Sequence, residues 1–374
     1  MDVELQVRKV LSNVRPIAWI APAPSSKMKI ELKDAVLTGA NTVSKWEYPE
    51  FDQTAIDLQL IETQAALRSV PVSLITKYIH LELELARESV AVIASRNDDR
   101  FVEWATRKHG RPSPNSLVSA RSAILDNGIS TPPAAEELDS RALAEMLQSA
   151  LRVNGLRDWM VRVSETQIAA VSVRSLDRIV SVRSDANFTT FDAARLMVHE
   201  VGTHAFRAAN AHGQPEPYAV LGLQNSTSTE EGLAAWHEAQ LGVSSRTVIH
   251  RYAARLIGAE LARESGIVDL THALAELVGI NDAVAIAIRA KRGLTDPNRI
   301  GGFGKDQAYF CGLEKVQAHL TSHPEDYALL MATKWPLEML EQARELFASR
   351  RLSSEGLLFP SVSLIRPLTD NGRN

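Results

Sequence analysis

Two histidines five positions apart, His199 and His204, are the feature that most constrains the local fold of this chain. In a regular α-helix five residues advance the chain by about 500°, so the two side chains point about 140° apart around the axis. A single π-turn, with about 4.4 residues per turn, brings them back to about 50° apart. The spacing therefore predicts a widened turn, and Gly202 between the histidines lowers the steric cost of that distortion.

The residue types around this pair are those of a zinc site. Two neutral imidazoles from one helix and a carboxylate from a second helix give zinc three protein ligands and leave one position for water. The segment Thr229–Ala234 supplies the carboxylate, and we select Glu231 because small residues follow it and allow a close approach of the two helices. Glu230 is then expected to point away from the metal.

Glu200, next to the first histidine, is the expected general base, which takes a proton from the attacking water. The alternative is an ordinary amphipathic helix with two incidental histidines. That alternative requires chance to supply both Glu200 and the later carboxylate.

Glu238 lies seven residues after Glu231 and so shares its helix face. It is a candidate hydrogen-bond partner for a metal-bound imidazole, and a solvated or salt-bridged carboxylate is an equally good interpretation. His237 and Glu238 also look like the start of an HExxH motif. Leu241 stands where the second histidine would be, so we do not expect a metal there.

These segments resemble a peptidase family that carries HExGTH followed by TEEGLA or QEGLA. Its members include bacterial QEGLA-motif proteins, and its eukaryotic relatives are the microtubule-associated tyrosine carboxypeptidases. The likeness extends from the two motifs above to Arg289–Gly293, similar to RxxRG, and to Gly301–Tyr309, similar to GGxTKDxxY with Gly304 in place of the threonine. A weaker likeness runs back to Ser44–Pro49, so the resemblance covers most of the chain.

The resemblance implies a zinc carboxypeptidase in which His199, His204 and Glu231 bind Zn2+ and Glu200 activates water. Such a reaction also needs a donor to the oxyanion and cations for the terminal carboxylate of the substrate. Tyr309 is the candidate donor, and the candidate cations are Arg292, Lys305 and Arg299. For each cation the alternative is a solvated side chain, and Lys305 with Asp306 could form a local salt-bridged turn.

We therefore expect a zinc metallopeptidase that acts as a carboxypeptidase on peptide or protein C-termini, removing an aromatic residue such as tyrosine if the resemblance extends that far. One alternative is a zinc endopeptidase with the same metal chemistry. A second alternative is a catalytically silent regulatory or scaffold protein. A three-ligand site with Glu200 intact argues against the second, because structural zinc is normally closed by four protein ligands.

The composition of the chain limits which partners and which cellular compartment are expected. The 374 residues carry a net charge of −4, so no basic balance indicates nucleic acid or an anionic membrane as a partner. The lone Cys311 excludes an intramolecular disulfide, which favours the cytoplasm. The chain lacks a signal-like start and the long basic extension of the tubulin-directed relatives, so neither secretion nor microtubule binding is expected. The oligomeric state is left open.

The pattern of apolar residues predicts an α+β fold, mostly helical, with a small antiparallel sheet before the HExxxH helix. Residues 1–150 are expected to form a helical lobe, 151–351 the zinc metallopeptidase region and 352–374 an irregular tail. Within the first lobe we predict an irregular segment at about 14–50, a break at Thr131–Pro133, and helices over Ala55–Val70, Val72–Ser95, Ser116–Asp126 and Ser140–Asn154.

Three β-rich runs follow, at Trp159–Ser164, Ala169–Val173 and Arg178–Val182. The last of them is our candidate edge strand for binding the substrate backbone by strand addition, on resemblance more than on pattern. A capping-box-like start at Thr189–Asp192 predicts the beginning of the histidine-bearing helix. Residues 213–228 are expected to form the loop between the two metal-binding helices.

Overall fold

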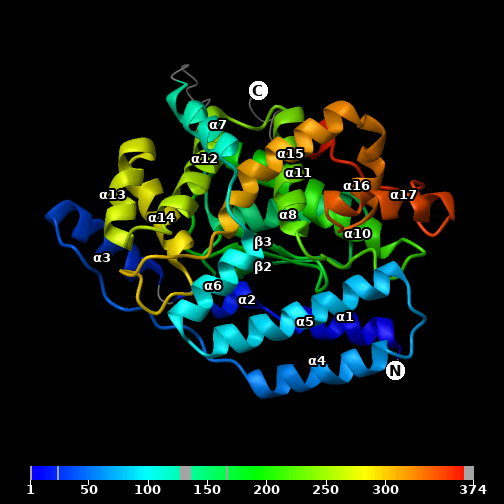
Figure 1. The fold of residues 1–374 in the computed structure, drawn as a ribbon. Coiled ribbons are helices and arrows are strands. Elements are labelled where there is room, and N and C mark those ends of the chain that lie inside the picture. The colour runs from blue at the N-terminus through cyan, green and yellow to red at the C-terminus, as the bar shows by residue number, and fades with distance from the viewer. Residues whose placement is uncertain (1, 23–24, 127–135, 166, 366–374) are drawn as a thin grey trace. The chain divides into compact units, whose positions relative to one another are not determined.

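The computed structural model describes residues 2–22, 25–126, 136–165 and 167–365. Within these residues helices predominate and the strands are few and short, which confirms the mostly helical α+β class (Figure 1). No helix among them combines the length and the apolar character needed to cross a lipid bilayer. The break predicted at Thr131–Pro133 and the end of the predicted tail, 366–374, lie outside the described residues.

The chain divides into two compact units, each built from two separate segments. Unit 1 comprises Met1–Gly128 and Arg246–Cys311, and unit 2 comprises Ile129–Ser245 and Gly312–Asn374. The division into 1–150, 151–351 and 352–374 stays a prediction about domains. The compact units cut across it, because residues 246–311 pack with the first 128.

Unit 1 is helical throughout. Its helices are α1 (Val3–Asn13), α2 (Pro16–Trp19), α3 (Ser25–Thr38), α4 (Gln53–Leu67), α5 (Leu74–Ala94), α6 (Asp98–His109), α7 (Pro114–Leu125), α12 (Arg246–Leu261), α13 (Ile267–Val278), α14 (Ile280–Lys291) and the 3-10 turn η2 (Lys305–Gln307). The helices predicted over residues 55–70, 72–95 and 116–126 are all present, with ends shifted by up to three residues.

The prediction of an irregular segment at 14–50 was wrong for its first half, because α2 and α3 lie there. Pro16 occupies the first turn of α2, a position where its missing N–H costs nothing. In α3, Met28, Leu32 and Ala35 recur at spacings of four and three and are buried. This face packs against α13 and α14. A short amphipathic stripe flanked by Pro, Ser and Thr was therefore mistaken for a loop.

Lys291, at the end of α14, is fully buried among backbone carbonyls. Its Nζ donates to the carbonyl oxygens of Ala262 at 3.0 Å, Ser265 at 2.5 Å, Arg299 at 2.7 Å and Gly301 at 2.8 Å. Burial lowers the pKa of Lys291 to about 7, whereas the four carbonyl dipoles favour the charged ammonium. One cation thereby ties α14 to the end of α12 and to the glycine-rich segment.

Unit 2 holds a small sheet and the remaining helices. Its elements are β1 (Glu137–Leu138), α8 (Ser140–Val153), β2 (Met160–Ser164), β3 (Val171–Arg174), β4 (Ile179–Arg183), β5 (Phe188–Thr189), α9 (Thr190–Leu196), the π-helix η1 (Met197–Ala205), α10 (Phe206–His212), α11 (Ser226–Gln240), α16 (Tyr327–Ala332), α17 (Leu340–Ala348) and the 3-10 turns η3 (Pro324–Asp326), η4 (Leu337–Met339) and η5 (Val362–Leu364). Helix α15 (Ala308–Ser322) begins in unit 1 and continues in unit 2. The loop predicted at 213–228 is present between α10 and α11, and its last residues belong to α11.

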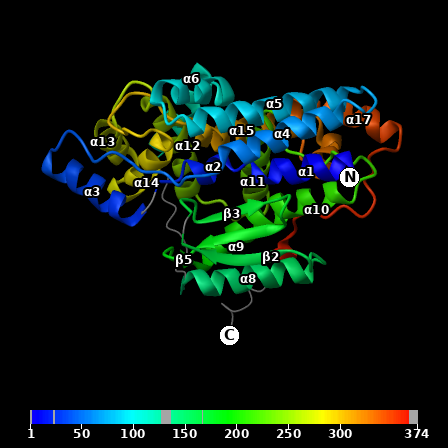
Figure 2. The ribbon, with the colours of Figure 1, turned by 90° about the horizontal axis from the view of Figure 1, so that it is seen from below.

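The main sheet has the strand order β2-β4-β3 and is mixed rather than wholly antiparallel. Strand β4 pairs parallel with β2 and antiparallel with β3. The prediction of Arg178–Val182 as the edge strand was therefore wrong, since this segment forms the centre. Val180 and Val182 are fully buried, as expected of a strand with a neighbour on each side. Helix α8 packs along β2 and β4 (Figure 2), and η1 contacts both α8 and β3.

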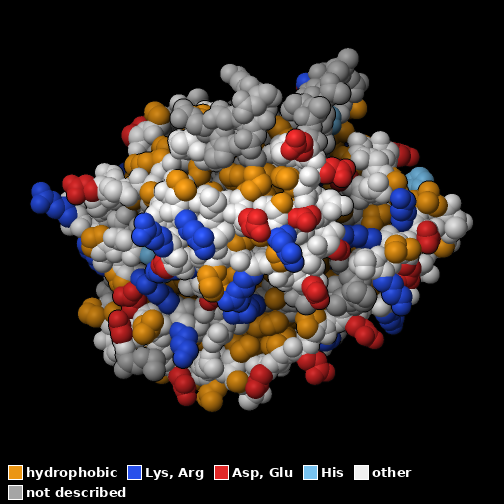
Figure 3. All heavy atoms as spheres, turned by 180° about the vertical axis from the view of Figure 1, so that it is seen from behind, with side chains coloured by type: hydrophobic (Ala, Val, Ile, Leu, Met, Phe, Trp, Pro, Cys, Tyr) orange, Lys and Arg blue, Asp and Glu red, His pale blue; other side chains and the backbone are white. Residues whose placement is uncertain are grey.

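The charged side chains on the face of the molecule in Figure 3 are of both signs. Lysine and arginine are interspersed with aspartate and glutamate, and apolar side chains lie between them. This mixture agrees with the small net charge of the sequence.

Two glycines in unit 2 let the backbones of α11 and α15 touch. A Cβ on Gly232 would lie 2.2 Å from the carbonyl carbon of Gly312, and a Cβ on Gly312 would lie 2.1 Å from the carbonyl oxygen of Ser228. Neither neighbour is a flexible side chain that can move aside. The small residue Gly232 of the TEEGLA segment thus allows α11 and α15 to cross in direct backbone contact.

Gly232→Ala should separate these two helices and lower the free energy of unfolding by about 1–3 kcal/mol, because the added methyl meets backbone atoms. Gly213→Ala is the matched control, since its Cβ would have only ordinary contacts, the nearest at 3.5 Å. Urea denaturation of both variants measures the difference. Equal stability of the two would contradict the backbone contact.

Candidate metal centre

The histidine pair lies on a π-helix, as the spacing predicts. The element η1 runs from Met197 to Ala205, and the rings of His199 and His204 meet with centroids 4.9 Å apart. The capping box predicted before it is present, with Thr189 and Asp192 bonded to each other across the first turn of α9.

Gly202 has a packing role that the sequence only partly indicates. A Cβ there would lie 2.8 Å from Cβ of Pro360 and 2.9 Å from Cδ1 of Leu364, so the segment before the C-terminus packs directly on the π-helix. The glycine therefore accommodates both the widened turn and a close neighbour.

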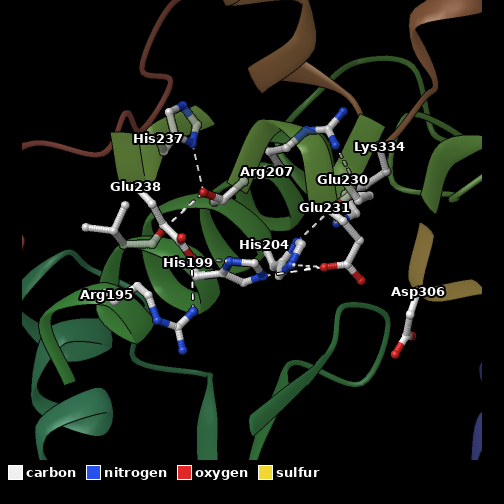
Figure 4. A network of polar contacts seen from close by, with 12 residues as sticks. Arg195, His199, His204, Arg207, Glu230, Glu231, His237, Glu238, Asp306 and Lys334 are labelled. Carbon is white, nitrogen blue, oxygen red and sulfur yellow. Dashed lines mark hydrogen bonds and ion pairs between the residues drawn. The ribbon is translucent and has the colours of Figure 1, made fainter. Parts of the chain in front are cut away.

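Helix α11 brings Glu231 to the two rings (Figure 4). Its Oε2 lies 3.4 Å from Nε2 of His199 and 3.8 Å from Nε2 of His204. One ligand atom from each residue lies within 4.8 Å of the others, and this is the cluster in the described part of the chain that could hold a metal ion. Two Nε2 atoms and one carboxylate oxygen facing a common point are a donor set that fits zinc.

A buried carboxylate fixes the ring of His199 from behind. Nδ1 of His199 donates to Glu238 at 2.7 Å, and Arg195 donates to the same oxygen at 3.0 Å. Glu238 is fully buried. The predicted role of Glu238 as partner of an imidazole is thus confirmed, and the alternative of a salt-bridged carboxylate also holds because Arg195 neutralises it.

A second carboxylate does the same for His204. Nδ1 of His204 donates to Glu230 at 2.9 Å, and Glu230 also pairs with Arg207 and, at 2.5 Å, with Lys334. Burial raises the pKa of Glu230, but Arg207 and Lys334 outweigh it and hold the pKa well below its usual range. As predicted, Glu230 is not one of the residues that converge on the metal position. Its hydrogen bond to His204 was not predicted from the sequence.

The carboxylates around the two rings raise the pKa of both imidazoles. Burial disfavours the charged imidazole, but the hydrogen bonds with Glu231 and Glu238 raise the pKa of His199 to about 10. For His204 burial acts in the same way, and Glu230 and Glu231 again raise the pKa. The carboxylates that favour a proton between them and the rings would equally favour a cation.

His237 belongs to a different network. It contacts Oγ1 of Thr203 at 2.8 Å and the hydroxyl of Tyr327 at 2.9 Å. Burial, with nearby Arg207, lowers the pKa of His237 to about 3, so this ring is neutral. It supports the middle of η1 from the outside through Thr203.

Glu200 is buried on the π-helix, 7% exposed and adjacent in sequence to His199. Its negative charge helps to raise the pKa of that histidine. The proposed general base therefore belongs to unit 2 together with all three candidate metal ligands.

The predicted substrate-binding residues belong to unit 1. Arg292 is buried and donates to Asp306 at 3.1 Å, and Arg289 also donates to that carboxylate. Asp306 therefore pairs with arginines. Nζ of Lys305 lies 5.8 Å from the ring centre of Tyr309. The roles proposed for these residues stay predictions.

Arg299, the remaining candidate cation, is itself in an ion pair. Its guanidinium lies 2.5 Å from Asp99, and both side chains are largely exposed. Arg299 therefore fits the alternative given above for each cation, a solvated surface side chain.

Comparison with known proteins places the chain in a family. A family model described as microtubule-associated tyrosine carboxypeptidase matches residues 41–370. Microtubule-associated tyrosine carboxypeptidase 1 of Mus musculus is 33% identical over 156 residues, which are 40% of this chain and 32% of the mouse protein. The Homo sapiens protein of the same name is 32% identical over 129 residues, 33% of this chain and 27% of the human protein. The matched part thus spans about a third of these relatives. This chain belongs to the microtubule-associated tyrosine carboxypeptidase family.

Proposed function

We propose that this protein is a zinc-dependent carboxypeptidase that removes the last residue of peptides or proteins. The observation that carries the proposal is the convergence of His199, His204 and Glu231 beside the buried Glu200. Membership of a family named for carboxypeptidases supports the reaction, and the name of its curated relatives supports tyrosine as the residue removed.

The donor set fits zinc, and Nε2 of His199, Nε2 of His204 and a carboxylate oxygen of Glu231 would hold it. The Nδ1 atoms of both rings are already bonded to carboxylates, which orients the Nε2 atoms for a metal. Bound zinc supplies Lewis-acid polarisation of a carbonyl oxygen and lowers the pKa of water toward about 7.

The remaining steps are assigned to side chains of the protein. Glu200 takes the proton from the attacking water and passes it to the leaving amine. Tyr309 is the proposed hydrogen-bond donor to the oxyanion, and Arg292 and Lys305 are the proposed contacts to the substrate. A cytoplasmic setting remains part of this proposal.

Two other functions use the same metal site. A zinc endopeptidase would share every metal ligand and would differ only in ignoring the free carboxylate of the substrate. A silent scaffold is less well supported, because the candidate cluster offers three protein ligands, one fewer than structural zinc normally takes.

Zinc binding should release protons. Zinc requires neutral imidazoles, and the metal-free rings of His199 and His204 have raised pKa values, so at pH 7 the metal must displace protons. We expect about one zinc per chain and an apparent affinity that rises as the pH rises toward 10. Calorimetric titration of metal-free protein, in two buffers with different ionisation enthalpies, measures the protons released.

His204→Ala should weaken zinc binding by at least about 10–100-fold, the range for loss of lesser supporting residues. His323→Ala is the control, because that side chain is about half exposed and lies outside the cluster. Native protein without zinc, or full zinc content in the His204 variant, would contradict the ligand assignment.

Glu200→Gln should keep the fold and the zinc but lose peptidase turnover by about three orders of magnitude or more, since an amide does not accept the proton from water. Glu345→Gln, on the exposed surface of α17, is the matched control and should leave turnover unchanged. Single-turnover kinetics on one peptide compares them. Normal turnover of the Glu200 variant would remove this residue from its role.

The choice between carboxypeptidase and endopeptidase depends on the free end of the substrate. We expect a peptide ending in tyrosine to be cleaved about 10- to 150-fold faster, in kcat/KM, than the same peptide with an amidated end, which corresponds to about 1.5–3 kcal/mol. Mass spectrometry of both digests measures this ratio. Internal cuts, or equal cleavage of both peptides, would establish the endopeptidase instead.

A further inference from the structure

Thr203 lies inside the π-helix η1, and its hydroxyl bonds to the backbone of the same element. Its Oγ1 donates to the carbonyl oxygen of Val198, five residues earlier, at 3.0 Å. In a regular α-helix a threonine hydroxyl reaches the carbonyls three or four residues earlier. A π-helix instead pairs each N–H with the carbonyl five residues earlier. The hydroxyl of Thr203 therefore bonds to the carbonyl that belongs to the widened register.

Buried threonines on two other helices show the ordinary pattern. Thr63 on α4 donates to the carbonyl of Gln59, and Thr271 on α13 donates to that of Ile267, each four residues earlier and at 2.7 Å. Thr203 is as buried as these two threonines and differs from them in the register of its bond. A threonine hydroxyl thus stabilises the helix register that its own hydrogen bond matches.

His237, on α11, determines the direction of the bond that Thr203 makes. Its Nδ1 lies 2.8 Å from Oγ1 of Thr203, and its Nε2 lies 2.9 Å from the hydroxyl of Tyr327. A threonine hydroxyl has one proton, and that of Thr203 is directed at the carbonyl of Val198, so Nδ1 of His237 is the donor to Oγ1. Nε2 then accepts a hydrogen bond from Tyr327.

This assignment requires a neutral imidazole, and the surroundings of His237 favour one. The side chain is 2% exposed, and burial with the charge of Arg207 lowers the pKa of His237 to about 3. The protons of Tyr327, His237 and Thr203 each have one acceptor in this arrangement. All of these residues belong to unit 2, as η1 does.

We propose that Thr203 is a positioning residue that holds η1 in the π-register, and that His237 and Tyr327 keep its hydroxyl directed at the backbone. Two side chains five residues apart share a helix face only in that register, so Thr203 acts on His199 and His204 through the backbone. The effect on a metal rests on the proposed zinc function, whereas the effect on the register does not.

Four variants of the full chain separate this role from a general contribution to stability. Thr203→Val removes the hydroxyl and leaves a β-branched side chain, whereas Thr203→Ser keeps the hydroxyl. Tyr327→Phe removes the other end of the hydrogen-bonded series. Thr271→Val is the matched control, because it removes an equally buried threonine hydroxyl that bonds within α13 of unit 1. Circular dichroism and urea denaturation establish that each variant is folded.

Zinc affinity is measured by competition with a chelator, and the visible absorption of cobalt(II) added to metal-free protein reports the coordination geometry. We expect Thr203→Val to bind zinc about 10–100-fold more weakly, the range for residues that orient metal ligands, and to change the cobalt spectrum. Tyr327→Phe should lose less affinity, because the threonine hydroxyl remains. Thr203→Ser and Thr271→Val should match the parent protein in both measurements.

The parent's zinc affinity and cobalt spectrum in Thr203→Val would overturn the proposal, and so would equal losses of affinity in Thr203→Val and Thr271→Val. Should Thr203→Val fail to fold, Tyr327→Phe decides the question. Weaker zinc binding in that variant supports the proposal, and the affinity of the parent overturns it.

Hydrogen exchange of the metal-free protein tests the register without zinc. The amides of residues 197–205 should exchange faster in Thr203→Val than in the parent, while those of α13 stay unchanged. If the parent binds no zinc, the proposed function fails, and faster exchange over 197–205 still supports the role of Thr203 in the π-register. Unchanged exchange over these residues would overturn that role whether or not the protein binds zinc.

Discussion

The centre depends on one constraint, that two imidazoles five residues apart must face the same point. A regular helix does not allow this, and the chain meets the constraint by widening a full nine-residue stretch, Met197–Ala205, into a π-helix. The surrounding structure is built to hold that unusual element. Gly202 admits the segment near the C-terminus against one side, and Thr203 bonds to His237 on another. Helix α11 lies against the same element and supplies Glu231.

Each ring is held by a buried carboxylate, and the two carboxylates differ in the number of cations that neutralise them. Behind His199, Glu238 is balanced by the single cation Arg195. Behind His204, Glu230 is balanced by two, Arg207 and Lys334. Buried charges are tolerated only when they are paired, and here each carboxylate is paired both with a ring and with a cation. Arg207 is fixed in turn by the backbone carbonyls of Leu330 and Trp335. The orientation of the ligand atoms therefore also depends on residues that do not contact the metal position themselves, such as Arg207.

Sequence reasoning succeeded where the controlling interactions are local. The π-turn follows from a spacing of five, and the place of Glu238 on the same helix face as Glu231 follows from helix periodicity. It failed where partners are distant in sequence. Nothing near Glu230 indicates that Lys334, 104 positions later, pairs with it. The prediction of the strand order failed for a related reason. The central position of β4 depends on pairing with β2 and β3, and the residue pattern of β4 itself does not identify these neighbours. In α3 a polar composition concealed a real apolar stripe.

The carbonyl cage around Lys291 has a further consequence for how unit 1 responds to its surroundings. Four backbone oxygens at 2.5–3.0 Å around a monovalent cation resemble the coordination of a potassium ion. Here the cation is covalently attached to the chain, so its occupancy does not depend on the concentration of any salt. The glycine-rich segment around Gly301 is consequently organised as if by a bound ion that cannot diffuse away, for as long as the Lys291 ammonium keeps its proton. Changes in the ionic composition of the medium, which would empty a true potassium site, leave this one filled.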